Sequence, residues 1–288
     1  MTPDPDESRG EAGRRKLRIL SYNIQVGINY TKYRHYVTRS WQHVLPYSGR
    51  QGNLDGIARF IASFDVVGLQ EVDAGSLRSA FINQTKYLAF RAGFPFCHTQ
   101  TNRKIGHLAR HSLGLLSRVR PFEIREWRLP GRIPGRGALV AIYGCRPVRL
   151  AIVTVHLALG KNARTRQLEH LARQIEAFEH VVVMGDFNCR IDDPELYRLI
   201  KHAGLHAPER EMRTFPSWRP KRGLDHILVS HGLTPQRPRV FMAEFSDHLP
   251  IAVDIVVPPE MELDWGPERC SFPPPVVPVV HAGGIRDL

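Results

Sequence analysis

Residues 181–188 constrain the fold of this chain more than any other stretch, because an apolar run there ends abruptly in polar residues. Three consecutive valines are typical of a buried strand, and Gly185 suits a tight exit from it. Because side chains alternate in extended backbone, Asp186 and Asn188 are expected to point the same way, with Phe187 turned toward the core. The stretch therefore predicts a buried strand that ends in two polar groups, although the same residues could cap a following helix.

Other predicted strands also carry polar residues at their ends. An alternating strand over residues 17–24 delivers Asn23, where an amide needs either a turn or a ligand. A buried strand over residues 66–73 carries Glu71, and a free carboxylate there would be costly to bury without a cation, a metal or water. The same pattern recurs later in the chain, where strand ends deliver His156, Asp225, Asp247 and His248.

Convergence of these strand ends in one pocket is the economical interpretation. Their carboxylate and amide oxygens, without a cysteine cluster, favour Mg²⁺ or Mn²⁺. A histidine beside an acid suits proton transfer or contact with a phosphate oxygen. The chain has neither a Gly-x-Ser-x-Gly motif nor a P-loop, so nucleophilic serine chemistry fits less well. The pattern predicts metal-assisted attack of water on phosphorus by residues drawn from Asn23, Glu71, His156, Asp186, Asn188, Asp225, Asp247 and His248.

Amphipathic segments between the strands predict helices. Asn53 is expected to cap one whose apolar residues recur at helical spacing up to Phe64. Further helices are predicted over residues 77–92, 163–178 and from 194 to 204, with a basic loop near residues 103–111. Arg166 lies near the start of the third helix, where a cation opposes the helix dipole unless an anion is close, so it is a candidate phosphate contact. The remaining predicted strands span residues 112–117, 122–129, 138–143, 148–155, 223–229, 240–245 and 251–257.

The formal net charge of +12 favours a partner that carries phosphate, which includes a soluble phosphoester, a nucleic acid or an anionic membrane surface. A basic surface without a ligand is the alternative. No segment has the pattern of a secretion signal or of a membrane span, so a cytoplasmic location is expected. The composition predicts a folded body over residues 16–257, between a disordered segment at 1–15 and a proline-rich, disordered tail at 258–288.

Six short blocks (SYNI, LQEV, TVHL, GDFN, LDHI and SDHLP) occur in the order seen in the endonuclease/exonuclease/phosphatase superfamily. The chain resembles this superfamily over nearly the whole body. The resemblance implies a four-layer α/β/β/α sandwich, in which helices flank two packed mixed β-sheets and the site lies at one end between the sheets. It also implies an enzyme, a metal-dependent hydrolase of phosphoester bonds.

The resemblance further implies roles for the polar residues. Glu71 would bind Mg²⁺, with Asn23 and Asp247 close to the metal or the phosphate. Asp186 would orient or activate the water with help from Asn188. The remaining roles fall to the histidines and their partner: His248, held by Asp225, would contact the phosphate or act as the base, and His156 would lie near the leaving group.

Three functions remain open at this point. The first is a Mg²⁺-dependent phosphodiesterase or phosphatase that acts on a lipid headgroup or a small phosphoester. The second is a DNA or RNA nuclease, which the basic body and the aromatic, basic segment 30–43 favour. The third is a binding module with a degenerate site, which the intact set of polar residues argues against.

Overall fold

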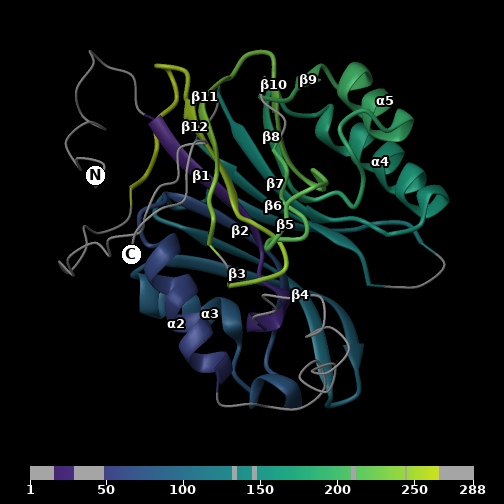
Figure 1. The fold of residues 1–288 in the computed structure, drawn as a ribbon. Helices are drawn as coiled ribbons and strands as arrows, with labels where there is room; N and C mark the ends of the chain where they lie inside the picture. Colours follow the sequence, from purple (N-terminus) through teal and green to yellow (C-terminus); the bar gives the residue numbers. More distant parts are fainter. Residues whose placement is uncertain are drawn as a thin grey trace.

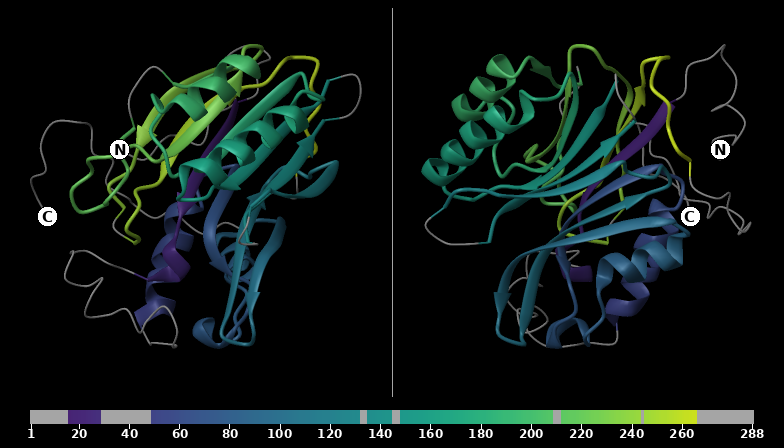
Figure 2. Two further views of the ribbon diagram at one scale, coloured as in Figure 1. Left: turned by 90° about the vertical axis from the view of Figure 1, so that its right-hand side faces the viewer. Right: turned by 180° about the vertical axis from the view of Figure 1, so that it is seen from behind.

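The computed structural model describes residues 16–28, 49–131, 135–144, 148–208, 212–243 and 245–265. These residues form four layers, with two six-stranded mixed sheets packed face to face and helices on both outer faces (Figures 1 and 2). This is the α/β/β/α sandwich expected from the sequence.

The first sheet has the order β11-β12-β1-β2-β4-β3. Here β1 is parallel to β2 and antiparallel to β12. Helices α2 (Gly49–Ile61) and α3 (Gln84–Ala92) cover its outer face (Figure 1). The strands are β1 (Lys16–Asn23), β2 (Val66–Asp73), β3 (Phe96–Ile105), β4 (Ala109–Ser117), β11 (Thr234–Val240) and β12 (Ile251–Val256).

The second sheet has the order β5-β6-β7-β8-β10-β9, and α4 (Lys161–Ile175) and α5 (Pro194–His202) cover its outer face (Figure 2). Here β7 and β8 are parallel, and β10 is antiparallel to β8. The strands are β5 (Glu123–Arg128), β6 (Gly137–Tyr143), β7 (Leu150–His156), β8 (His180–Asp186), β9 (Leu205–His206) and β10 (Asp225–Ser230). Two short 3₁₀ helices, η1 (Gln25–Gly27) and η3 (Leu77–Ser79), follow β1 and β2.

The two sheets approach closely at Gly68 of β2. A Cβ atom at this position would lie 2.6 Å from both Cε of Met184 and Oγ1 of Thr154, which belong to the second sheet. Leucine, isoleucine and valine side chains fill the rest of the interface. Glycine at this point therefore lets β2, which carries Glu71, pack against β8, which ends in Asp186.

Two predicted elements are corrected. Asn53 does not cap a helix, because α2 already begins at Gly49 and the Asn53 amide instead donates to the carbonyl oxygen of Phe245 at 2.8 Å. The strand expected at 240–245 lies earlier, as β11. Its two prolines disfavour a strand assignment, but β11 is an edge strand, where a missing N–H donor is tolerated.

The basic residues expected in a loop at 103–111 belong instead to a β-hairpin. Strand β3 continues to Ile105 and β4 begins at Ala109, so only the turn lies between them. The polar residues of β3 did not indicate a strand because β3 is also an edge strand and is mostly half-exposed or exposed. The hairpin holds these cations on a defined backbone.

The described chain extends past residue 257. Met261 and Leu263 are buried, and Trp265 forms a β-bridge with Val119. The first eight residues of the expected tail therefore pack against the sandwich. The rest of that tail, the segment 1–15 and the whole aromatic segment 30–43 lie outside the described residues. Within the described part, no helix has the length and apolar character needed to span a membrane.

Candidate active site

The polar strand ends meet at one edge of the sandwich. In the second sheet, His156, Asp186 and Asp225 are paired neighbours across β7, β8 and β10. In the first sheet, Asn23 at the end of β1 pairs with Gln70, the residue before Glu71. Strand β10 is antiparallel to β8, and β12 is antiparallel to β1. Their first residues therefore lie at the edge where β8 and β1 end.

Asn23 connects the two sheets. Its Nδ2 atom donates to Oε1 of Glu71 at 3.3 Å and to Oδ2 of Asp186 at 3.2 Å. Its Oδ1 atom accepts from the backbone N–H of Gln25 at 3.1 Å, which fixes the orientation of the amide. Asn23 is buried, so these bonds satisfy a group that would otherwise be costly to desolvate.

His248 and Asp225 form a buried pair. Nδ1 of His248 lies 2.8 Å from Oδ2 of Asp225, and the same oxygen accepts a hydrogen bond from the Thr214 hydroxyl at 2.5 Å. Burial alone lowers the pKa of His248, but the carboxylates of Asp225 and Asp186 raise it well above its usual value. His248 is therefore held as an imidazolium, with Nε2 3.9 Å from Oδ2 of Asp186.

His156 lies on the other side of Asp186 and has the opposite electrostatic character. Its Nε2 atom lies 3.5 Å from Oδ2 of Asp186 and 3.9 Å from Oε1 of Glu71. Burial and the nearby charges of Arg136 and His248 lower its pKa well below the usual value. The site thus contains one charged and one neutral imidazole.

The carboxylates of the site lie close together, and the nearby cations do not fully offset their burial and mutual repulsion. Burial raises the pKa of Asp186 to about 7, with His248 opposing this shift and Asp225 adding to it. Loss of hydration and then the charge of Asp247 raise the pKa of Glu71. Crowded carboxylates of this kind fit a divalent cation, because a cation offsets both their repulsion and their desolvation. Glu71 and Asp247 offer carboxylate oxygens that could bind such a cation, whereas the Asn23 oxygen already accepts from the Gln25 N–H.

A second group of possible ligands lies close by. Atoms of Asp186, Asp225 and His248 lie within 4.8 Å of one another, so this buried group could also hold a metal. However, Nδ1 of His248 and Oδ2 of Asp225 are already hydrogen-bonded to each other. These two atoms are therefore not free for a metal unless the His248–Asp225 hydrogen bond breaks.

The backbone leaves the extended conformation at two site residues. Glu71 has a φ of 54° in a bulge of β2 opposite β4, which aims its side chain out of the regular alternation. Asn188 has a φ of 53°, so alternation from Asp186 does not extend to it. Its Nδ2 atom instead donates to the carbonyl of Leu157 at 3.0 Å, while its N–H donates to Oδ1 of Asp186 at 2.9 Å.

Arg166 is exposed on α4, and its role as a phosphate contact stays a prediction. The neighbouring Arg164 also lies near the start of this helix, but it is buried and its charge is balanced by an acidic residue. Its guanidinium contacts Oε1 of Glu195 at 2.7 Å and donates to the carbonyls of Ala158 and Leu159. The Arg164–Glu195 ion pair therefore connects α4 to α5.

Sequence reasoning missed Arg136. This half-buried residue lies close enough for its charge to lower the pKa of His156 and to oppose the rise in the pKa of Glu71. Its neighbours explain its position, because a Cβ on Gly135 would lie 2.9 Å from Cβ of Arg103, and one on Gly137 would lie 2.3 Å from Oδ1 of Asn102. An arginine between two glycines is the only local signal of it in the sequence.

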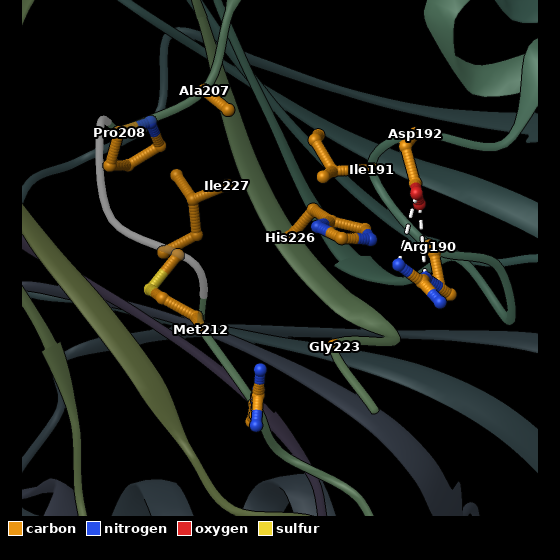
Figure 3. Close-up of a pocket in the computed structure, with 10 residues that line it drawn as sticks. Arg190, Ile191, Asp192, Ala207, Pro208, Met212, Gly223, His226 and Ile227 are labelled. Atoms are coloured by element: carbon orange, nitrogen blue, oxygen red, sulfur yellow. Dashed lines mark hydrogen bonds and ion pairs between the residues drawn. The ribbon is translucent and has the colours of Figure 1, made fainter. Parts of the chain in front are cut away.

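A separate cavity of about 480 Å³ lies beside β10 (Figure 3). It contains His226 but none of the predicted site residues. The His226 ring packs against Phe187, and its Nε2 atom contacts the carbonyl oxygen of Cys189 at 2.8 Å. The cavity is lined by Arg190, Ile191, Asp192, Ala207, Pro208, Met212, Arg213, Gly223, His226 and Ile227. It is thus distinct from the catalytic edge.

The fold is an α/β/β/α sandwich, and its polar strand ends form a buried cluster of carboxylates and imidazoles that could hold a metal. Residues 20–248 match the model of the endonuclease/exonuclease/phosphatase family, and the chain belongs to this family. It is accordingly an enzyme that hydrolyses phosphoester bonds. None of the curated proteins searched matches the chain.

Solved structures support the same fold. An endonuclease/exonuclease/phosphatase protein from Beutenbergia cavernae is 18% identical, with a TM-score of 0.66 over 85% of this chain and 72% of that one. A mannosyl-6-phosphatase from Bacteroides thetaiotaomicron is 16% identical, with a TM-score of 0.65 over 84% of this chain and 100% of the other. The human Nocturnin catalytic domain with bound sulfate is 17% identical, with a TM-score of 0.61 over 85% and 98% of the two chains.

Proposed function

We propose that this protein is a Mg²⁺-dependent phosphoesterase that cleaves a P–O bond by attack of water. The observation that carries the proposal is the position of the Asp186 carboxylate. Its Oδ2 atom lies 3.2 Å from Nδ2 of Asn23, 3.5 Å from Nε2 of His156 and 3.9 Å from Nε2 of His248. A basic oxygen thus lies among groups that can bind an oxyanion.

Glu71 and Asp247 would hold the Mg²⁺, with Mn²⁺ as a possible substitute, and Asn23 would position the Glu71 carboxylate. When bound, the cation neutralises the phosphate and stabilises the departing oxygen. The carboxylate donors present fit either ion.

The residues of the chain account for the proton and charge movements. Asp186 accepts a proton from the attacking water, since its pKa of about 7 suits a general base at neutral pH. The His248 imidazolium, held by Asp225, donates a hydrogen bond to a phosphate oxygen. His156 lies near the leaving group, and the backbone N–H of Asn188 orients Asp186. Arg136 adds positive charge beside the phosphate.

A lipid headgroup or a small phosphoester is the substrate class that we favour. The similar fold of a mannosyl-6-phosphatase supports a small phosphoester. The expected cytoplasmic location and the contact with an anionic membrane surface stay predictions.

A substrate panel tests the proposal. Bis(4-nitrophenyl) phosphate, 4-nitrophenyl phosphate, sphingomyelin-type and phosphatidylinositol-type lipids, plasmid DNA, abasic duplex and RNA are each incubated with Mg²⁺, with Mn²⁺ and with EDTA. We expect turnover of at least one ester that EDTA abolishes and added Mg²⁺ restores. If none of the substrates is hydrolysed with either metal, the proposal is wrong and the binding-module alternative is favoured.

A nuclease is the second candidate, and the basic β3–β4 hairpin favours it. Arg103, Lys104 and His107 are exposed there, on a chain with a net charge of +12. Nucleic-acid binding through several phosphates weakens steeply with salt, whereas binding of a small ester depends on salt much less. The KM measured between 50 and 200 mM NaCl therefore separates the two candidates.

A further inference from the structure

A row of ionisable residues crosses the first sheet beside the catalytic edge. Asp73 of β2 pairs with His111 of β4, and His111 pairs with Arg103 of β3. Residues directly opposite each other on neighbouring strands project from the same face of a sheet. Leu113 and Leu115 of the same strand, at the same alternation as His111, belong to the core between the two sheets. The row therefore faces the second sheet.

Asp73 pairs with Arg78 but has no capacity left to neutralise the other cations of this row. Its two carboxylate oxygens already accept five hydrogen bonds, all between 2.6 and 3.1 Å. The donors are Gly75 N–H, Ser76 Oγ, Arg78 Nε, Ser79 Oγ and Arg110 N–H. Since a carboxylate offers about four lone-pair sites, these donors from the following loop and from β4 use up its capacity.

Arg78 shows that the charge here is incompletely satisfied. The residue is 3% exposed, and its Nε atom contacts Oδ2 of Asp73 at 2.6 Å. Its Nη2 atom is buried and has no hydrogen-bond acceptor among the residues that the structure describes. A buried guanidinium nitrogen without an acceptor is costly, and an anion that reached it would remove this cost.

Arg136 connects the row to the catalytic residues. Gly135 and Gly137 both abut β3, at Arg103 and Asn102, which places Arg136 over the end of this strand. The Arg136 charge also acts on Glu71 and on His111. Three guanidinium groups, those of Arg78, Arg103 and Arg136, thus lie along one flank of the site.

His111 supports this interpretation. Burial and the charges of the surrounding arginines lower its pKa to about 4, even though Asp73 opposes the shift. The imidazole is therefore neutral at pH 7, and the arginines are left to bind an anion. A neutral imidazole can still donate one hydrogen bond to it.

We infer that Arg78, Arg103, His111 and Arg136 form a second anion subsite, which binds a phosphate group of the substrate other than the one that is cleaved. This inference rests on the proposed function, because it concerns the substrate of the same site. The second phosphate belongs either to a small bisphosphate or to the next linkage of a nucleic acid. A charge-assisted contact of this kind contributes roughly a factor of 10 or more to affinity.

Calorimetry tests the subsite without requiring turnover. Thymidine 5′-phosphate is compared with thymidine 3′,5′-bisphosphate, and fructose 6-phosphate with fructose 1,6-bisphosphate, in the presence of Mg²⁺. We expect the bisphosphate of at least one pair to bind about 10-fold more tightly, and Arg103→Ala to reduce this ratio about 10-fold. Arg103 is exposed, so this variant is expected to fold.

Arg120→Ala is the matched control, because Arg120 is also an exposed arginine but pairs with Asp264 away from the site. It should keep the wild-type ratio. A preference in the thymidine pair points to nucleic acid, and one in the fructose pair points to a small bisphosphate. Equal affinities in both pairs, or the same ratio in Arg103→Ala as in the wild type, overturn the subsite. The proposed function is judged separately, by EDTA-sensitive turnover of the nitrophenyl esters.

Discussion

Nδ1 of His248 lies 2.8 Å from Oδ2 of Asp225, which joins the segment before β12 of one sheet to the first residue of β10 in the other. The pair therefore forms only when the two sheets are packed. Phe215 packs on the His248 ring, with 4.9 Å between the ring centroids, so the imidazole is held from a third side. This makes the pair a sensitive probe of the site.

Asp225→Asn should lower kcat by about 10²- to 10⁴-fold with little effect on folding, because the imidazole loses both its orientation and its stabilised charge. If His248 acts as an imidazolium, activity falls as the pH rises through its pKa. Asp225 raises that pKa, so the variant should lose activity at a lower pH than the wild type. The measurement is kcat against pH.

Asp192→Asn is the control for this variant. Asp192 is an exposed carboxylate paired with Arg190 in the loop after β8, and removing its charge should change kcat less than twofold. If Asp225→Asn kept near-normal kcat and an unchanged pH profile, the role of the His248–Asp225 pair would be wrong.

Glu71→Gln should weaken metal binding, because a neutral amide replaces one of the two carboxylates assigned to the cation. We expect the Kd for Mg²⁺ to rise at least about 10-fold, and the stabilisation of the folded state by added Mg²⁺ to shrink accordingly. Thermal unfolding over a Mg²⁺ titration measures both. Glu126→Gln is the control, since this residue lies on the exposed strand β5, and added Mg²⁺ should stabilise it as much as the wild type. If Mg²⁺ also stabilised Glu71→Gln as much as the wild type, Glu71 would not be a metal ligand.

The metal-free protein should lose stability as the pH rises. The pKa of Asp186 is about 7 in the folded state against an ordinary value of 3.8, so its contribution is full below about pH 4 and is lost as the pH passes 7. Urea unfolding in EDTA at pH 5 and pH 8 should differ by at least about 1 kcal/mol in the free energy of unfolding. Asp186→Asn should reduce this difference; a difference that the variant left unchanged would assign it to other groups.

Gly185→Ala should destabilise the fold by about 3 kcal/mol or more. Gly185 has a φ of 148°, and a Cβ atom there would lie 2.0 Å from the carbonyl oxygen of Val155 on the paired strand. Urea unfolding measures the loss. Gly52→Ala is the control, since nothing lies within 4 Å of that position in α2 and alanine should stabilise the helix by several tenths of a kcal/mol. Similar stabilities for the two variants would contradict the argument.

Much of the fold was predictable because its central strands are local and strongly apolar. Strands β8 and β2 can each be recognised from a stretch of at most eight residues that is mostly apolar. The polar residues at or near their ends indicate where a functional site can form. The edge strands β3 and β11 were not predicted correctly. Their residues are half-exposed, and their strand conformation depends on pairing with a neighbour rather than on their own composition.

The amino-acid sequence by itself determined the family, and the α/β/β/α class followed from the resemblance of six short blocks to that family. Residue order and periodicity determined which strand ends carry acids, amides and imidazoles. Only the tertiary structure decided which of these groups contact one another and how their neighbours shift their pKa values. The neutral state of His156, the turn of Asn188 toward Leu157 and the approach of Arg136 to Glu71 all arise from contacts between segments distant in the chain. Burial and Coulomb interactions depend on distance in space, which a linear pattern does not contain.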